Sequence, residues 1–69
     1  MTTSEFQVTG MTCGHCEMSV REEVGEVPGV DTVEVSHRNG KLLVGSVVEV
    51  DDAVILAAVR EAGYAAVRV

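Results

Sequence analysis

The chain has 69 residues and a formal net charge of −6; 46% of its residues are hydrophobic and only Phe6 and Tyr64 are aromatic. This length allows one small domain over residues 1–69, and the hydrophobic content is too high for a disordered chain. The acidic balance argues against nucleic-acid binding. No membrane insertion is expected, because the longest apolar run, residues 53–59, is far shorter than the roughly 20 residues that span a bilayer.

The N-terminal part predicts a strand followed by a helix. Residues 4–9 alternate between apolar and polar side chains, which is typical of a half-buried strand. From about residue 14 to Gly25 the apolar residues recur every four positions instead, which predicts a short amphipathic helix that ends before Pro28. The residues expected on its buried side are Cys16, Val20 and Val24.

The middle of the chain predicts a hairpin. Residues 32–36 alternate again and predict a second strand, and a third strand is expected through Leu42 and Val44. Between them, Asn39-Gly40 readily takes the positive φ angles of a tight turn. The continuation over residues 47–50 fits either a strand or a connector.

A second helix and a last strand complete the chain. Asp51 or Asp52 can cap this helix, and Gly63 fits the position just past its C-terminus. Residues 64–69 are short and valine-bearing, which predicts a final strand. The residues expected on the buried side of the helix are Val54, Ile55, Ala58, Val59 and Ala62.

The predicted order is therefore β-α-β-β-α-β. One layer of strands cannot bury its apolar side alone, so the two helices are expected to cover one face of a four-stranded antiparallel sheet. The fold class is α+β, and the simplest architecture is a ferredoxin-like sandwich.

Cys13 and Cys16 are the two cysteines of the chain. A small secreted domain built on disulfides normally has four or more, and a pair three residues apart closes too small a loop to stabilise a fold. The N-terminus shows no basic start followed by an apolar core, so no signal peptide is expected and the reducing cytoplasm is the expected setting. The thiols are therefore expected to be reactive or metal-binding.

The position of this pair suggests its chemistry. Cys13 and Cys16 lie between the first strand and the first helix, where unpaired amides and the helix dipole favour thiolates. Thiolates select Cu(I), with Zn(II) as the common competitor, but structural zinc usually takes four ligands and no second pair is present. Disulfide exchange is the alternative from another class, because Cys-Gly-His-Cys also occurs in protein disulfide isomerases.

Four segments together resemble a known family, the heavy-metal-associated domain, and within it the small bacterial copper chaperones of the CopZ type. The resemblance covers essentially the whole chain. It implies the ferredoxin-like fold, Cu(I) bound by Cys13 and Cys16, no enzymatic activity, and transfer of the ion to the metal-binding domain of a copper-transporting P-type ATPase. The segments are GMTCGHC at residues 10–16, VPGV at 27–30, VEV at 33–35 and EAGY at 61–64.

The resemblance also suggests roles around the metal. It implies that Met11 packs beneath the metal loop and that the loop containing Tyr64 approaches it, so that Tyr64 shields the site. His15, between the cysteines, is either a solvated side chain or a group that tunes the thiolates or offers a third ligand. Met18 is expected to be exposed, and His37, beside the hairpin turn, is expected to be solvated.

Several alternatives stay open at this point. The chain is either a separate chaperone or an excised regulatory domain of a copper ATPase, and Zn(II) or Hg(II) could replace Cu(I). A monomer is expected without metal, and a copper-bridged homodimer is plausible with it. The acidic residues near the first helix either steer a basic partner or only keep the protein soluble; they are Glu17, Glu22, Glu23 and Glu26.

Overall fold

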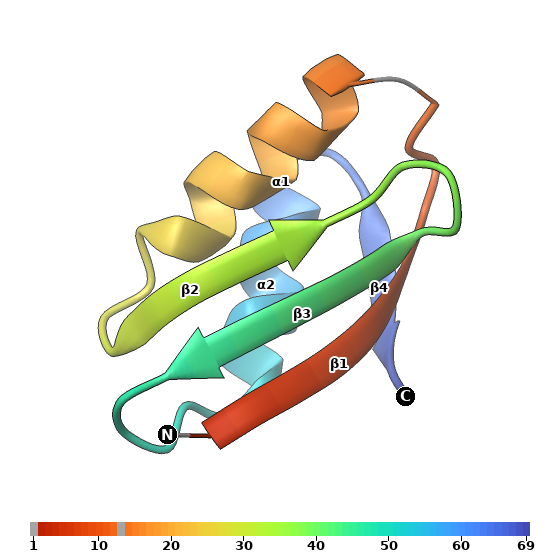
Figure 1. Cartoon of the computed structure of the whole chain (residues 1–69). Helices are drawn as coiled ribbons and strands as arrows, with labels where there is room; N and C mark the ends of the chain where they lie inside the picture. The colour runs from red at the N-terminus through yellow and green to blue at the C-terminus, as the bar shows by residue number, and fades with distance from the viewer. Residues whose placement is uncertain (1, 13) are drawn as a thin grey trace.

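Four strands and two helices follow one another in the predicted order over residues 2–12 and 14–69, which the computed structural model describes. The sheet is antiparallel with strand order β2-β3-β1-β4, and both helices lie on one face of it (Figure 1). The predicted ferredoxin-like fold is confirmed. The elements are β1 (Thr2–Thr9), α1 (Gly14–Gly25), β2 (Val30–Val35), β3 (Lys41–Ser46), α2 (Asp52–Glu61) and β4 (Ala65–Arg68).

Strand β1 lies inside the sheet and begins two residues earlier than predicted. It pairs with β3 on one side and β4 on the other, so that Phe6 lies opposite both Leu42 and Arg68. Phe6 and Leu42 are fully buried, whereas Glu5 on the other face reaches Lys41 at 3.9 Å. The alternation in the sequence thus separates the helix-covered face from the solvent face.

The hydrophobic core lies between the sheet and the two helices. Cys16, Val20 and Val24 contribute the buried side of α1, as predicted. For α2 the prediction was wrong at Val54, which is 45% exposed. Successive side chains of a helix differ by about 100° in direction. Because the buried side of α2 is centred on Ile55 and Val59, Val54 points outward. The buried residues of α2 are Ile55, Ala58 and Val59.

The hairpin between β2 and β3 is wider than the Asn-Gly motif predicted. Its loop covers residues 36–40, all of which are described; Gly40 has φ +71°, whereas Asn39 does not have a positive φ. The Gly40 carbonyl accepts a hydrogen bond from Val8 N at 2.7 Å, which continues the β1–β3 pairing one residue beyond Gln7 and Lys41. Residues 47–50 form a connector.

The end of α2 fixes where β4 begins. Gly63 has φ +97°, and Gly63 N donates to Arg60 O at 2.9 Å while Tyr64 N donates to Val59 O at 3.2 Å. The first bond is nested within the second, and together they satisfy the carbonyls of Arg60 and Val59, as expected for a glycine in the left-handed conformation. They also set the direction in which the chain leaves towards Tyr64.

The start of α2 gives a prediction about stability. Asp51 is its N-cap, and Oδ1 accepts a hydrogen bond from Ala53 N at 3.0 Å. Replacing Asp51 by alanine is expected to lower the free energy of unfolding by about 1 kcal/mol, because a donor of the first turn loses its acceptor. Urea denaturation measures this, with the exposed Asp31→Ala as the control. Equal stability in the two variants would contradict the role of the cap.

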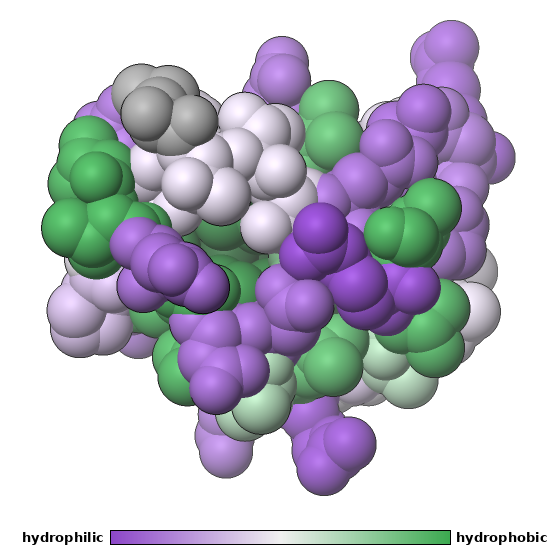
Figure 2. Space-filling model, turned by 90° about the horizontal axis from the view of Figure 1, so that it is seen from below, coloured by the Kyte–Doolittle hydropathy of each residue, from purple (hydrophilic) through white to green (hydrophobic). Residues whose placement is uncertain are grey.

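Apolar side chains are dispersed over one end of the molecule. Figure 2 shows the end of the molecule that lies at the bottom of Figure 1, where hydrophobic areas are separated by hydrophilic ones. Within the described part of the chain, neither helix is long and apolar enough to cross a membrane. Among residues 2–12 and 14–69, the large apolar side chains that are exposed are Met18, Val47, Val48, Val54, Val67 and Val69.

Candidate metal centre

The loop between β1 and α1 begins next to the turn that follows α2. Thr9 pairs with Ala65, which brings Gly10 beside Tyr64. Gly10 has φ +95°, and a Cβ at this position would lie 3.3 Å from Cδ1 of Tyr64. The partly buried tyrosine ring therefore lies against the first residue of the loop, and a side chain larger than that of glycine would press on it.

Cys16 is held in the first turn of α1, facing the core. Its exposed fraction is 9%, and Thr12 N lies 3.5 Å from its Sγ. The hydroxyl Oγ1 of Thr12 lies 3.8 Å from the same sulfur. A backbone N–H directed at sulfur stabilises negative charge there, so this arrangement favours the thiolate that a soft metal requires. The sequence did not single out Thr12 as a neighbour of this sulfur, although its position shortly before the start of α1 was consistent with such a contact.

Cys13, the other predicted ligand, lies outside the described residues. Its role therefore stays a prediction. Among residues 2–12 and 14–69, no three His, Cys, Asp or Glu side chains gather as a metal-binding group.

The remaining residues predicted near the metal occupy different environments. Met11 is 9% exposed and belongs to the hydrophobic core together with Cys16. His15 is exposed, and its carbonyl accepts a hydrogen bond from Ser19 Oγ at 3.2 Å. Met18 is 55% exposed, as expected from its position on α1. Met11 is thus a core residue, while His15 and Met18 lie at the surface, and the supporting role expected for Met11 stays a prediction.

The expectation that His37 is solvated is wrong. One carboxylate oxygen of Glu17, Oε2, accepts from His37 N at 2.7 Å and lies 2.5 Å from Nδ1 of the same residue. The backbone bond first, and then the imidazole bond, lowers the pKa of Glu17 below its ordinary value. The side chains of His37 and Glu17 are 31% and 24% exposed. The two residues are 20 positions apart, so no local pattern predicted this pair.

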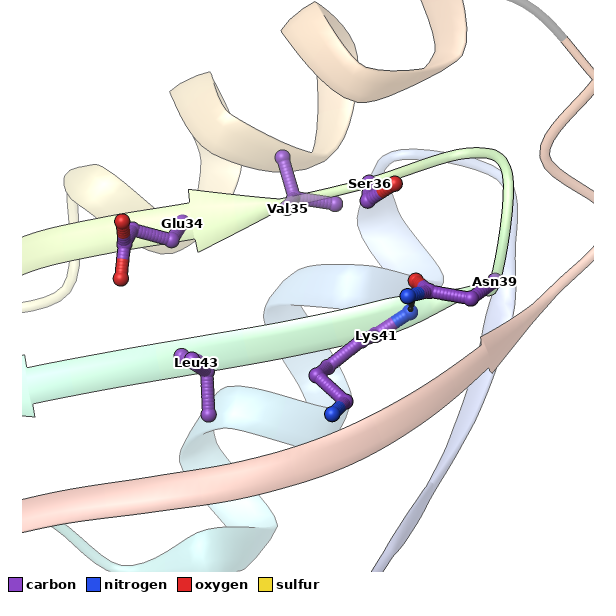
Figure 3. A pocket seen from close by; sticks show the side chains of 6 residues that line it. All are labelled: Glu34, Val35, Ser36, Asn39, Lys41 and Leu43. Carbon is purple, nitrogen blue, oxygen red and sulfur yellow. Dashed lines mark hydrogen bonds between the residues drawn. The ribbon is translucent and has the colours of Figure 1, made fainter.

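A hollow of about 260 Å³ lies on the opposite, solvent-facing side of the sheet, between β2 and β3 (Figure 3). Glu34 and Lys41 contribute the charged groups of its lining. The lining includes no sulfur or imidazole, so it offers no soft metal ligand. The lining residues are Glu34, Val35, Ser36, Asn39, Lys41 and Leu43.

Comparison with known proteins places these features in a family context. The family model described as "Heavy-metal-associated domain" matches residues 5–65. The copper chaperone CopZ of Enterococcus hirae is 39% identical over 67 residues, which cover 90% of this chain and 91% of that protein. Copper-transporting ATPase 1 of Rhizobium meliloti is 45% identical over 60 residues, which cover 87% of this chain but only 7% of the ATPase.

Solved structures agree with this likeness. A CopZ metallochaperone superposes with a TM-score of 0.89 at 28% identity, covering 96% of this chain and all of the other. The N-terminal domain of ZntA in its Zn(II) form gives a TM-score of 0.87 at 30% identity, covering 97% of this chain and 90% of that one. The same fold thus occurs in proteins named for different metals.

Proposed function

Because the chain belongs to the heavy-metal-associated domain family, we propose that it is a cytoplasmic Cu(I) chaperone that forms one domain over residues 1–69. In this proposal Cys13 and Cys16 are the two ligands, and the copper ion is cargo. The observation that carries it is the sulfur of Cys16 at the start of α1, with Thr12 N directed at it at 3.5 Å.

Copper is the metal that the observations favour. Two thiolates suit Cu(I), which accepts low coordination, whereas a structural zinc site usually needs four ligands. The described residues supply no cluster of three His, Cys, Asp or Glu beside Cys16. The copper chaperone relative also aligns over nearly its whole length. Carriage of Zn(II) is the competing possibility, since the zinc-loaded ZntA domain shares the fold.

Transfer proceeds by ligand exchange. A Cu(I) ion held by two sulfurs has room for a third, so a thiolate of the partner binds before one donor sulfur leaves. Each step replaces one Cu–S bond by another, no electron is transferred, and no substrate is chemically altered. The proposed partner is the metal-binding domain of a copper-transporting P-type ATPase, and one relative of this chain is named a copper-transporting ATPase.

The same relative supports a second assignment, in which the chain is itself the metal-binding domain of such an ATPase. The ATPase matches 87% of this chain, and the chain spans 7% of its length. Both assignments require the same metal loop. In the first assignment the protein carries copper between separate partners, whereas in the second it senses copper and relays it within the ATPase.

The proposed function is tested by anaerobic titration of the reduced protein with Cu(I), and separately with Zn(II), each against a competing chelator. We expect one Cu(I) per chain with sub-picomolar affinity, much weaker Zn(II) binding, and Cu(I) transfer to an ATPase metal-binding domain on mixing. Gel filtration of the copper-loaded protein measures whether it forms the copper-bridged dimer. Weak Cu(I) binding or a preference for Zn(II) would reject the proposal, and efficient insulin reduction would favour the oxidoreductase alternative.

A further inference from the structure

The β2–β3 hairpin contacts the strand that leads into the metal loop. The Gly40 carbonyl accepts from Val8 N at 2.7 Å, and the Asn39 carbonyl accepts from the Gln7 side-chain amide at 2.6 Å. A Cβ at Gly40 would collide with the Gln7 side chain and lie 2.5 Å from Val8 O, so only glycine permits this approach. The hairpin is therefore fixed to β1 close to its end at Thr9.

The same hairpin contacts the helix that follows the metal loop. His37, two residues before Asn39, donates from its backbone to Glu17 Oε2, and its Nδ1 lies 2.5 Å from the same oxygen. Because an ionised carboxylate only accepts, Nδ1 is the donor in this contact. Glu17 follows Cys16 directly in the first turn of α1. Charge-assisted bonds of this kind are stronger than neutral ones and fix geometry as well.

These contacts connect the two sides of the metal loop through one hairpin. The loop leaves β1 after Thr9 and enters α1 at Gly14. The hairpin binds Gln7 and Val8 of β1, which precede the metal loop, and it also binds Glu17 of α1, which follows the loop. Holding both flanking elements reduces the conformational freedom that the loop would lose when its sulfurs gather around one ion. Such preorganisation increases affinity without any contact to the ligand.

We propose that Glu17 and His37 are positioning residues of the metal loop, which couple the β2–β3 hairpin to the first turn of α1 and thereby raise the affinity for a soft metal ion. The inference rests on the proposed function, because it takes Cys13 and Cys16 as the ligands. Neither positioning residue touches the metal. Both act through Cys16 and its loop.

The test is a double-mutant cycle of Glu17→Gln and His37→Ala, with Cu(I) affinity measured by chelator competition at one fixed neutral pH. Each single variant is expected to bind Cu(I) about tenfold more weakly, as for other residues that orient metal ligands. The double variant is expected to lose no more than one single variant, because the two act as a pair. His37→Asn is expected to restore affinity, since its side-chain N–H₂ can replace the Nδ1 donor.

Two controls separate positioning from general effects of charge and stability. Glu34→Gln on β2 removes the same charge as Glu17→Gln, and Arg38→Ala shortens the exposed side chain next to His37 on the hairpin, so both are expected to bind Cu(I) as the wild type does. Urea denaturation of the metal-free variants establishes that all are folded in the assay. Hydrogen exchange of the Met11 and Thr12 amides measures how ordered the loop is in the metal-free protein. We expect this exchange to be faster in His37→Ala than in the wild type.

The outcomes are distinct. Weaker binding and faster exchange in the folded Glu17 and His37 variants support the inference. Unchanged affinity in these variants, with tight binding by the wild type, overturns the inference and leaves the proposed function intact. An equal loss of affinity in the control variants assigns the effect to charge and also overturns it. A wild-type protein that does not bind Cu(I) overturns the proposed function and the inference together.

Discussion

Replacing Cys16 by serine is expected to lower the Cu(I) affinity at least about a thousandfold, equivalent to about 4 kcal/mol. A serine hydroxyl stays protonated at neutral pH and is a hard donor, so it cannot replace a soft thiolate. The stabilising contact from Thr12 N to Cys16 Sγ is lost as well. Anaerobic titration of Cys16→Ser and Cys13→Ser against a Cu(I) chelator measures the two losses.

The control for this prediction is Ser19→Ala on the same helix. It removes a hydroxyl that donates a hydrogen bond to the His15 carbonyl, and it is expected to keep wild-type affinity. Because Cys16 is 9% exposed, the serine variant must also be shown to be folded by circular dichroism. A folded Cys16→Ser protein with wild-type affinity would remove Cys16 from the site.

Replacing Phe6 by alanine is expected to cost about 3–5 kcal/mol of the free energy of unfolding. A domain of this length has a total of only about 4–10 kcal/mol, so the variant should lose from about a third to all of its stability. Phe6 is fully buried, and the guanidinium carbon of Arg68 lies 5.5 Å from the centre of its ring. The substitution therefore leaves a cavity and removes a cation–π contact. Urea denaturation followed by circular dichroism measures the loss.

Val67→Ala on the neighbouring strand β4 is the matched control. Val67 is 63% exposed, so its truncation is expected to change stability by less than about 0.5 kcal/mol. A loss of under about 1 kcal/mol in Phe6→Ala would show that the core does not depend on this ring. Phe6→Leu, which keeps much of the volume, is expected to lie between the two variants.

Much of the fold could be predicted because its information is local. Strand alternation around Phe6 and the four-residue period through Cys16, Val20 and Val24 depend only on neighbouring residues and on which side faces the core. The cap at Asp51 and the terminating glycine at Gly63 are local backbone chemistry of the same kind. Each of these was therefore visible in the sequence.

The predictions that were wrong concern residues whose surroundings depend on how separate elements pack together. The Asn39-Gly40 motif indicated a tight turn, but the loop covers residues 36–40, and Gly40 is hydrogen-bonded to Val8 of β1. Val54 is apolar, as core residues are, and is nevertheless 45% exposed. The position of α2 on the sheet decides which side of the helix is covered. His37 is polar and beside a turn, which suggested solvation, yet it bonds to Glu17.

The sequence by itself determined the order of elements and most of the core, because periodicity follows from backbone geometry, and it contains the predicted metal-binding motif. Only the tertiary structure decided the surroundings of that motif. The ring of Tyr64 lies against Gly10 because β4 pairs with β1, and Glu17 meets His37 because the hairpin reaches α1. These contacts join residues that are distant along the chain, and the packing of the sheet and helices brings them together.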